Sequence, residues 1–136
     1  MKNIFCLLLF FVFSNAFSQS DTLIKKIDKN LIGSWKGSDV DRNTLDITLY
    51  WFTNRFEDGT YVIMFTSGKD CNVKCWVEKG TWWTNGGKFY KLNARTDVLT
   101  TYNYKSTGVS EIFFSVKPYD TKLENDDVFY YENLLD

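Results

Sequence analysis

From residue 33 onward, apolar residues of this chain recur with a period of two. Between residues 45 and 51, Leu45, Ile47, Leu49 and Trp51 occupy every second position. Successive side chains of a β-strand point to opposite faces, so this alternation is typical of a strand with one buried face. A helix would instead place its apolar residues three and four positions apart. The pattern therefore predicts a mainly β structure.

Similar short segments recur along the chain and are separated by turn sequences. Asp58-Gly59 and Gly86-Gly87 are strong hairpin signals. We predict about eight strands, over residues 33–40, 45–51, 61–65, 75–84, 89–94, 98–104, 111–117 and 128–131. Strands joined by tight turns form an antiparallel meander, and closing into a barrel or half-barrel is the simplest way to remove its edges. The interior of an eight-stranded barrel is filled by side chains or holds one small ligand.

The segment before the first strand has a different period. Leu23, Ile24, Ile27 and Leu31 follow helical spacing, and Asp21 stands where an N-cap residue would. We therefore predict a short helix or helical turn over residues 21–31, leading into the sheet.

Residues 1–18 have the layout of a cleaved secretory signal. Lys2 supplies the positive charge, residues 4–13 form an apolar run, and Ala16 and Ser18 place small residues before a cut ahead of Gln19. The run is shorter than the roughly 20 residues that a membrane span needs. We predict a secreted or periplasmic protein with one domain over residues 19–136. Losing Lys2 leaves 15 of the 16 basic residues against 17 acidic ones, a net charge near −2.

The composition excludes several kinds of site. Because the sequence contains no histidine, it can form no Ser-His or Cys-His dyad and no His-ligated zinc or haem site. Charges are interspersed, without the basic run of a nucleic-acid binder, and the acidic stretch 124–127 lacks the spacing of a calcium loop. No nucleophile has a recognisable base beside it, and no phosphate-binding loop is present. We therefore predict a protein that is not an enzyme and needs no cofactor or metal.

Cys71 and Cys75 are the only cysteines outside the signal. If residues 72–74 form a three-residue turn, the two sulfur atoms face each other across a hairpin within bridging distance. Together with the oxidising compartment, this spacing predicts a structural disulfide. Free thiols and a soft-metal pair remain as alternatives.

The element Gly33-Ser34-Trp35, placed directly after the lead-in segment, resembles the G-x-W signature of lipocalins. Two later elements, residues 55–61 and residues 80–82, resemble the small lipocalin-like domains of secreted bacterial proteins. The resemblance implies a calycin-type barrel in which Trp35 closes the floor and Gly33 lets the lead-in segment cross close to it. In that family a basic residue near the end of the last strand stacks on the floor tryptophan. This chain has no arginine after Arg95.

Aromatic residues are the main candidates for a binding site. Seven of the 12 Phe, five Trp and eight Tyr remain after the signal, which suggests an aromatic core, a lined cavity or both. If Trp35 points inward, parity makes the candidate site residues Trp51, Tyr61, Phe65, Trp76, Glu78, Trp82, Tyr102 and Tyr104. The large ones either fill the core or contact a ligand. Glu78 is either a buried polar handle for a ligand or a carboxylate at a rim. Tyr102 and Tyr104 either offer hydroxyl groups or pack across strands.

Two functions follow from this pattern. The first is a non-enzymatic protein that holds a small apolar ligand inside the barrel, which needs a cavity of roughly 300 Å³ or more. The alternative is a protein-interaction module whose filled barrel is a scaffold, which needs an exposed apolar patch. Tyr50, Phe52 and Trp83, which have outward parity, would build such a patch for a protein partner.

Overall fold

The computed structural model describes residues 24–40, 47–69, 72–117 and 128–135. The predicted signal and Cys71 lie outside the described residues. Eight strands form one sheet, and every neighbouring pair is antiparallel. They are β1 Gly33–Val40, β2 Ile47–Arg55, β3 Thr60–Lys69, β4 Asn72–Asn85, β5 Lys88–Asn93, β6 Leu99–Ser106, β7 Glu111–Ser115 and β8 Phe129–Leu134.

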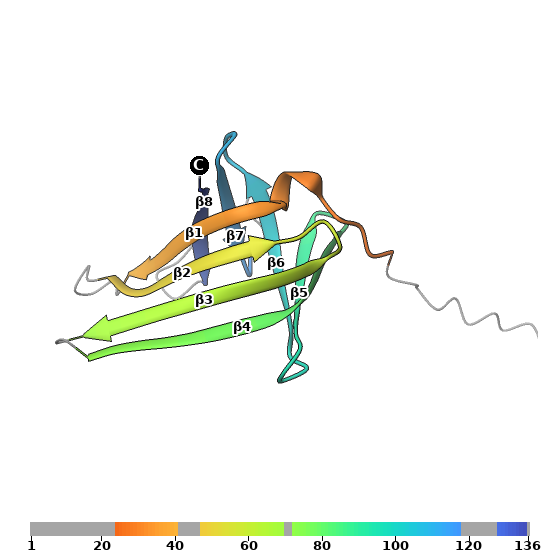
Figure 1. The fold of residues 1–136 in the computed structure, drawn as a ribbon. Coiled ribbons are helices and arrows are strands. Elements are labelled where there is room, and N and C mark those ends of the chain that lie inside the picture. Colours follow the sequence, from red (N-terminus) through yellow and green to blue (C-terminus); the bar gives the residue numbers. More distant parts are fainter. Residues whose placement is uncertain (1–23, 41–46, 70–71, 118–127, 136) are drawn as a thin grey trace, which may run out of the picture.

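The strands follow one another in sequence order, and the pairing of β1 with β8 closes the sheet into a barrel (Figure 1). The predicted all-β meander of about eight strands is therefore confirmed. The closing ladder is short, because it joins only Trp35–Gly37 to Glu132–Leu134. Other neighbours share longer ladders, and β3 with β4 forms the longest hairpin of the barrel (Figure 1).

The lead-in segment contains less helix than its apolar spacing predicts. A single 3₁₀ turn covers Lys29–Leu31, capped by Asp28, whose side chain accepts a hydrogen bond of 3.0 Å from the Asn30 N–H. Before it, Lys26 pairs with Thr84 of β4 through backbone hydrogen bonds of 3.1 and 2.7 Å. The barrel end thus satisfies backbone groups that a helix would satisfy internally. The proposed N-cap Asp21 lies outside the described residues.

Gly80 marks the place where β4 turns from one neighbour to the next. The strand pairs with β3 as far as Thr81 and with β5 from Gly80 onward. A Cβ atom on Gly80 would lie 1.9 Å from the carbonyl oxygen of Leu92. Only glycine therefore allows the two backbones to approach this closely, as is common at the bends of barrels.

Side chains fill the floor half of the barrel. This part of the core lies next to the 3₁₀ turn and contains Leu31, Trp35, Trp82, Phe89, Ile112 and Phe114. Trp35 is only 2% exposed, and its indole N–H donates to the carbonyl of Leu31 over 3.1 Å. Gly33, with φ of +120°, adopts a backbone conformation that favours glycine where the lead-in segment enters β1. Trp35 is therefore buried in the core beside the lead-in segment, and the family roles that the resemblance implies for Trp35 and Gly33 remain predictions.

The turn that would join the two cysteines is not present. Residues 72–74 belong to β4, and the first of them, Asn72, pairs with Lys69 of β3. Cys75 is exposed, and its sulfur lies 3.9 Å from Thr66 Oγ1 on β3. The predicted turn was wrong because β4 begins at Asn72, whereas the apolar residues of the segment predicted a strand that begins at residue 75. The disulfide itself remains a prediction, since Cys71 lies outside the described residues.

Within the described ranges, no helix is long and apolar enough to cross a membrane.

Candidate ligand-binding site

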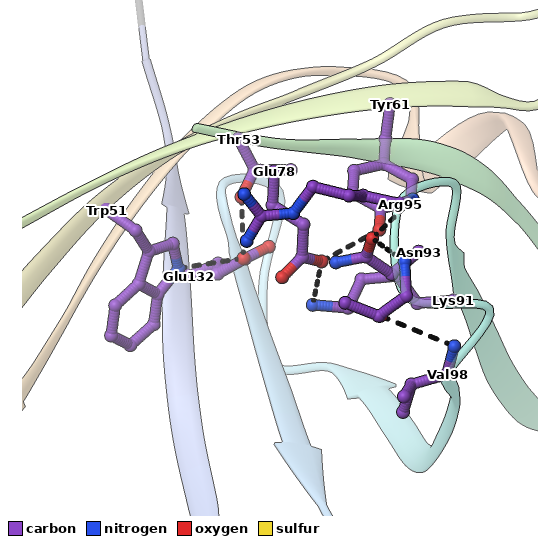
Figure 2. A network of polar contacts seen from close by, with 10 residues as sticks. Trp51, Thr53, Tyr61, Glu78, Lys91, Asn93, Arg95, Val98 and Glu132 are labelled. Carbon is purple, nitrogen blue, oxygen red and sulfur yellow. Dashed lines mark hydrogen bonds and ion pairs between the residues drawn. The ribbon is translucent and has the colours of Figure 1, made fainter. Parts of the chain in front are cut away.

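A buried ion pair crosses the middle of the barrel. Arg55, the last residue of β2, contacts Glu132 of β8 through Nη2 and Oε2, and each residue is 2% exposed. The other oxygen of Glu132 accepts hydrogen bonds from Trp51 Nε1 at 3.0 Å and Thr53 Oγ1 at 3.3 Å (Figure 2). The carboxylate is thus bonded on both oxygens, as a buried charge requires.

Aromatic rings surround the guanidinium of Arg55. Its Cζ lies 5.2 Å from the ring centre of Phe89, 5.3 Å from that of Phe114 and 5.9 Å from that of Trp35. These distances lie within the range of cation–π attraction. The basic residue beside the floor tryptophan therefore comes from the second strand, whereas the resemblance implied the end of the last strand.

Trp51 reaches Glu132 only because the strand between them carries a glycine. Gly37 of β1 pairs with Trp51 on one side and with Glu132 on the other. A Cβ atom on Gly37 would lie 2.3 Å from the indole ring of Trp51. The indole therefore lies across β1 and links β2 to β8 where the barrel closes.

Above this polar layer, formed by Arg55, Glu132, Trp51 and Thr53, the described residues leave part of the barrel unfilled. A cavity of about 190 Å³ extends from Arg55 and Glu132 toward the end where Asp39 and Val128 lie. Its walls are largely apolar and include Trp51, Ile63, Phe65, Phe89, Tyr102 and Tyr130. The volume is below the roughly 300 Å³ of a typical small-molecule pocket, but a cavity of about 150 Å³ is enough to enclose a benzene ring.

Glu78 is partly buried, and one of its carboxylate oxygens, Oε1, is held by two neighbours. It accepts hydrogen bonds from Tyr61 Oη at 2.7 Å and Lys91 Nζ at 2.8 Å (Figure 2). Burial raises the pKa of Glu78, but the hydrogen bonds from Lys91 and Tyr61 outweigh this effect and hold the pKa below its usual range. Of this group, Tyr61 and Lys91 line the cavity. Glu78 therefore holds two groups that line the cavity, and its own side chain is not part of the lining.

The remaining candidates divide into those beside the cavity and those below or outside it. Tyr102 lines the cavity and packs edge-on against Tyr130. Tyr104 donates to Asp28 Oδ2 at 2.7 Å, near the floor. Trp82 is buried in the floor core and stacks on Phe89. Trp76 stacks on Phe65 at 5.2 Å but is 44% exposed, so it lies toward the open end of the long hairpin.

The sequence analysis missed Arg55, Glu132 and Tyr130 as site residues. The predicted strand over residues 45–51 ends before Arg55, and the predicted strand over residues 128–131 ends before Glu132. The alternation of the sequence does carry a signal for them, because residues 51, 53 and 55 share one face of a strand and residues 130, 132 and 134 share one face of another. Charged residues at such inward positions are a signal of a buried pair.

The prediction that Trp83 is exposed was wrong. Trp83 is 6% exposed because Lys25 of the lead-in segment covers its ring at 4.2 Å and Tyr90 stacks on it at 5.5 Å. Tyr50 and Phe52 are about half exposed, as their outward parity requires. The outer face therefore keeps two of the three proposed patch residues.

Several inward tyrosines resist ionisation in the folded barrel. Burial and then the hydrogen bond to Asp28 raise the pKa of Tyr104 to about 12. The pKa of Tyr61 is raised by burial and by its bond to Glu78, and burial is the main cause of the raised pKa values of Tyr102 and Tyr130. The cavity is thus lined by neutral phenol groups.

Stability should therefore fall at alkaline pH. An unfolded tyrosine loses its proton near pH 10, whereas folded Tyr104 keeps it until about pH 12. The folded state then binds more protons than the unfolded state, so this stabilisation is present below pH 10 and is lost as the pH rises through 12. Urea midpoints measured from pH 9 to 12 should decrease, and less steeply in Tyr104→Phe. Midpoints that stay constant over this range would contradict the assignment.

A second hollow lies where β1 and β8 separate. It is a groove of about 840 Å³ along the outside of this seam, and its aromatic lining consists of Tyr50, Trp51, Phe52, Phe129, Tyr130 and Tyr131. Trp51 and Tyr130 also line the inner cavity, as do Asp39 and Phe129. The groove and the cavity therefore share a wall.

Comparison with known proteins adds no relative. No family model, curated protein or solved structure matches this chain significantly. The closed eight-stranded antiparallel barrel is consistent with a calycin-like fold.

Proposed function

We propose that this protein binds a small, mainly apolar molecule in the barrel interior, without catalysis. The observation that carries this proposal is the cavity of about 190 Å³ between aromatic walls and a fully bonded polar layer. Barrels of this strand number are often filled by side chains, so an unfilled half next to a rigid polar layer is typical of a preformed ligand site.

The cavity determines the kind of ligand. Its size fits a single ring and is too small to enclose a fatty acid, a retinoid or a haem. At the inner end of the cavity Arg55 is paired with Glu132 and Lys91 with Glu78, so the charges there balance, and Asp39 lies at the opposite end. A neutral ring with one polar substituent is therefore favoured. Its ring would pack on Trp51 and Phe89, and its polar group would bond to Lys91 or to the hydroxyl of Tyr102.

Phenol is the simplest test ligand for this proposal. Titration of the chain from Gln19 onward should shift the indole N–H resonance of Trp51 in a saturable way, because this group lies beside the cavity. The indole N–H of Trp83, which is buried outside the cavity, serves as the internal control. Equal small shifts of both resonances, without saturation, would contradict the proposal.

A pair of neighbouring substitutions on β3 localises the binding. Ile63 lines the cavity, whereas Val62 is on the outer face and 40% exposed. Ile63→Phe should weaken phenol binding by about tenfold or more, because the larger side chain would occupy part of the small cavity that the ring needs. Val62→Phe should leave it unchanged. Equal affinities in both variants would place the ligand elsewhere.

The outer face supports a second candidate, a protein-interaction module. Phe52, Met64 and Val77 are cross-strand neighbours on β2, β3 and β4 and are 46%, 44% and 61% exposed. Exposed apolar rows of this kind are common at interaction sites. Replacing all three residues by serine should then abolish capture of a protein partner without changing the fold. Unchanged capture would remove this candidate.

We also propose that the protein acts outside the cytoplasm. The support is the signal-like layout of residues 1–18 and the even number of remaining cysteines. Non-reducing mass spectrometry of the exported form should show an N-terminus near Gln19 and the mass of a Cys71–Cys75 disulfide. An intact Met1 end would contradict cleavage of an export signal, and two alkylatable thiols would contradict the disulfide.

A further inference from the structure

The ladder between β1 and β8 has fewer paired positions than the other ladders of the described barrel. It ends at Gly37 and Glu132, although β1 continues to Val40 and β8 begins at Phe129. The ladder across the seam therefore covers three positions of each strand, Trp35–Gly37 and Glu132–Leu134. All other neighbouring strands share at least four paired positions.

Side chains form the wall at this point. Because Gly37 has no side chain, the indole of Trp51 lies across β1, and its ring meets that of Tyr130 edge-on at 5.3 Å. These two rings line both the inner cavity and the outer groove. The partition between the two hollows is therefore made of side chains, which change rotamer far more easily than a paired strand opens.

The groove is suited to an apolar chain. Inward residues such as Trp51 and outward residues such as Phe52 and Tyr131 both line it, so it passes from the interior to the surface. Its lining carries one basic and one acidic side chain, Lys36 and Asp39, so it has no net charge. Because the inner cavity fits only a ring, the rest of a longer ligand would have to lie in this groove.

We infer that the β1–β8 seam is a lateral binding groove for the aliphatic tail of a ligand whose ring occupies the barrel interior. This inference rests on the proposed function, because the groove alone defines no ligand. It assigns the ligand to a class: a single ring with one polar group and an extended apolar tail. The tail leaves the barrel between the strands, past Trp51 and Tyr130.

A series of para-alkylphenols with methyl, propyl and hexyl tails tests the inference against phenol itself. A groove that covers half of the tail should raise the affinity about twofold per methylene, and thus about 30-fold from methyl to hexyl. If phenol binds but the hexyl compound does not, the barrel has no opening that accepts the tail. This result would support the interior site and refute the lateral groove. If neither phenol nor any alkylphenol binds, the proposed function fails as well.

A matched pair of surface variants places the tail. Phe52 lines the groove, and its cross-strand partner Met64 is equally exposed but does not line it. Phe52→Ser should lower the affinity for hexylphenol about fivefold and leave phenol binding unchanged. Met64→Ser should change neither. Equal effects of the two variants, or no effect of Phe52→Ser, would overturn the inference, because the tail would then lie elsewhere.

Discussion

Glu132→Gln is expected to destabilise the folded barrel by about 3–5 kcal/mol, because it leaves the charge of Arg55 buried without a partner. The guanidinium is 2% exposed and has no route to solvent that preserves its contacts with Phe89 and Phe114. The amide oxygen of glutamine can still accept hydrogen bonds from Trp51 and Thr53. The loss of stability would therefore measure the effect of the uncompensated charge of Arg55.

The double variant Arg55→Met with Glu132→Gln separates the charge from the packing. Methionine fills most of the arginine volume without a charge, so the double variant should recover a large part of the lost stability. The exposed Arg95→Ala is the control and should cost less than about 0.5 kcal/mol. Urea unfolding with a constant m-value measures all three. A cost below about 1 kcal/mol for Glu132→Gln, as for an exposed ion pair, would contradict the buried geometry.

Gly80→Ala is expected to cost about 3 kcal/mol or more, because the new methyl group would overlap the backbone of a neighbouring strand. The contact is with the carbonyl oxygen of Leu92, 1.9 Å away, and a carbonyl in a ladder cannot rotate aside as a flexible side chain can. The bend of β4 must therefore open or the β4–β5 ladder must shift.

Gly108→Ala provides the matched control. No atom lies within 4 Å of the position where its Cβ would be placed, so the substitution should change stability by less than about 0.5 kcal/mol. Thermal or urea unfolding of the two variants gives the comparison. Equal stabilities would mean that β4 does not bend against β5 in the way described.

Most of the fold was predictable because local patterns determine it. The alternation of Leu49 and Trp51 and the turns at Asp58-Gly59 and Gly86-Gly87 depend on nearest neighbours in the chain, which a sequence displays directly. The lead-in segment was predicted with more helix than it has. Its backbone pairs with Thr84, 58 residues away from Lys26, and a local pattern carries no information on such a partner.

The site was less predictable, because its central contacts join distant residues. Arg55 and Glu132 are 77 positions apart, and neither is unusual in its local sequence. The alternation of inward and outward residues could have placed both side chains inside the barrel, but it could not have shown that they contact each other. The burial of Trp83 depends on Lys25 crossing the outside of the sheet, which again needs the closed barrel. Cavity volume is a difference between large packed volumes, so no local pattern predicts it.

The most direct test of the interior site is a crystal structure of the chain from Gln19 onward with bound phenol. We expect a ring in the cavity above Arg55 and Glu132, in contact with Ile63 and Phe89, with the hydrogen bond between Trp51 and Glu132 retained. The contradicting result is a barrel in which Trp51 and Tyr130 have turned inward to fill this space and no ring is bound.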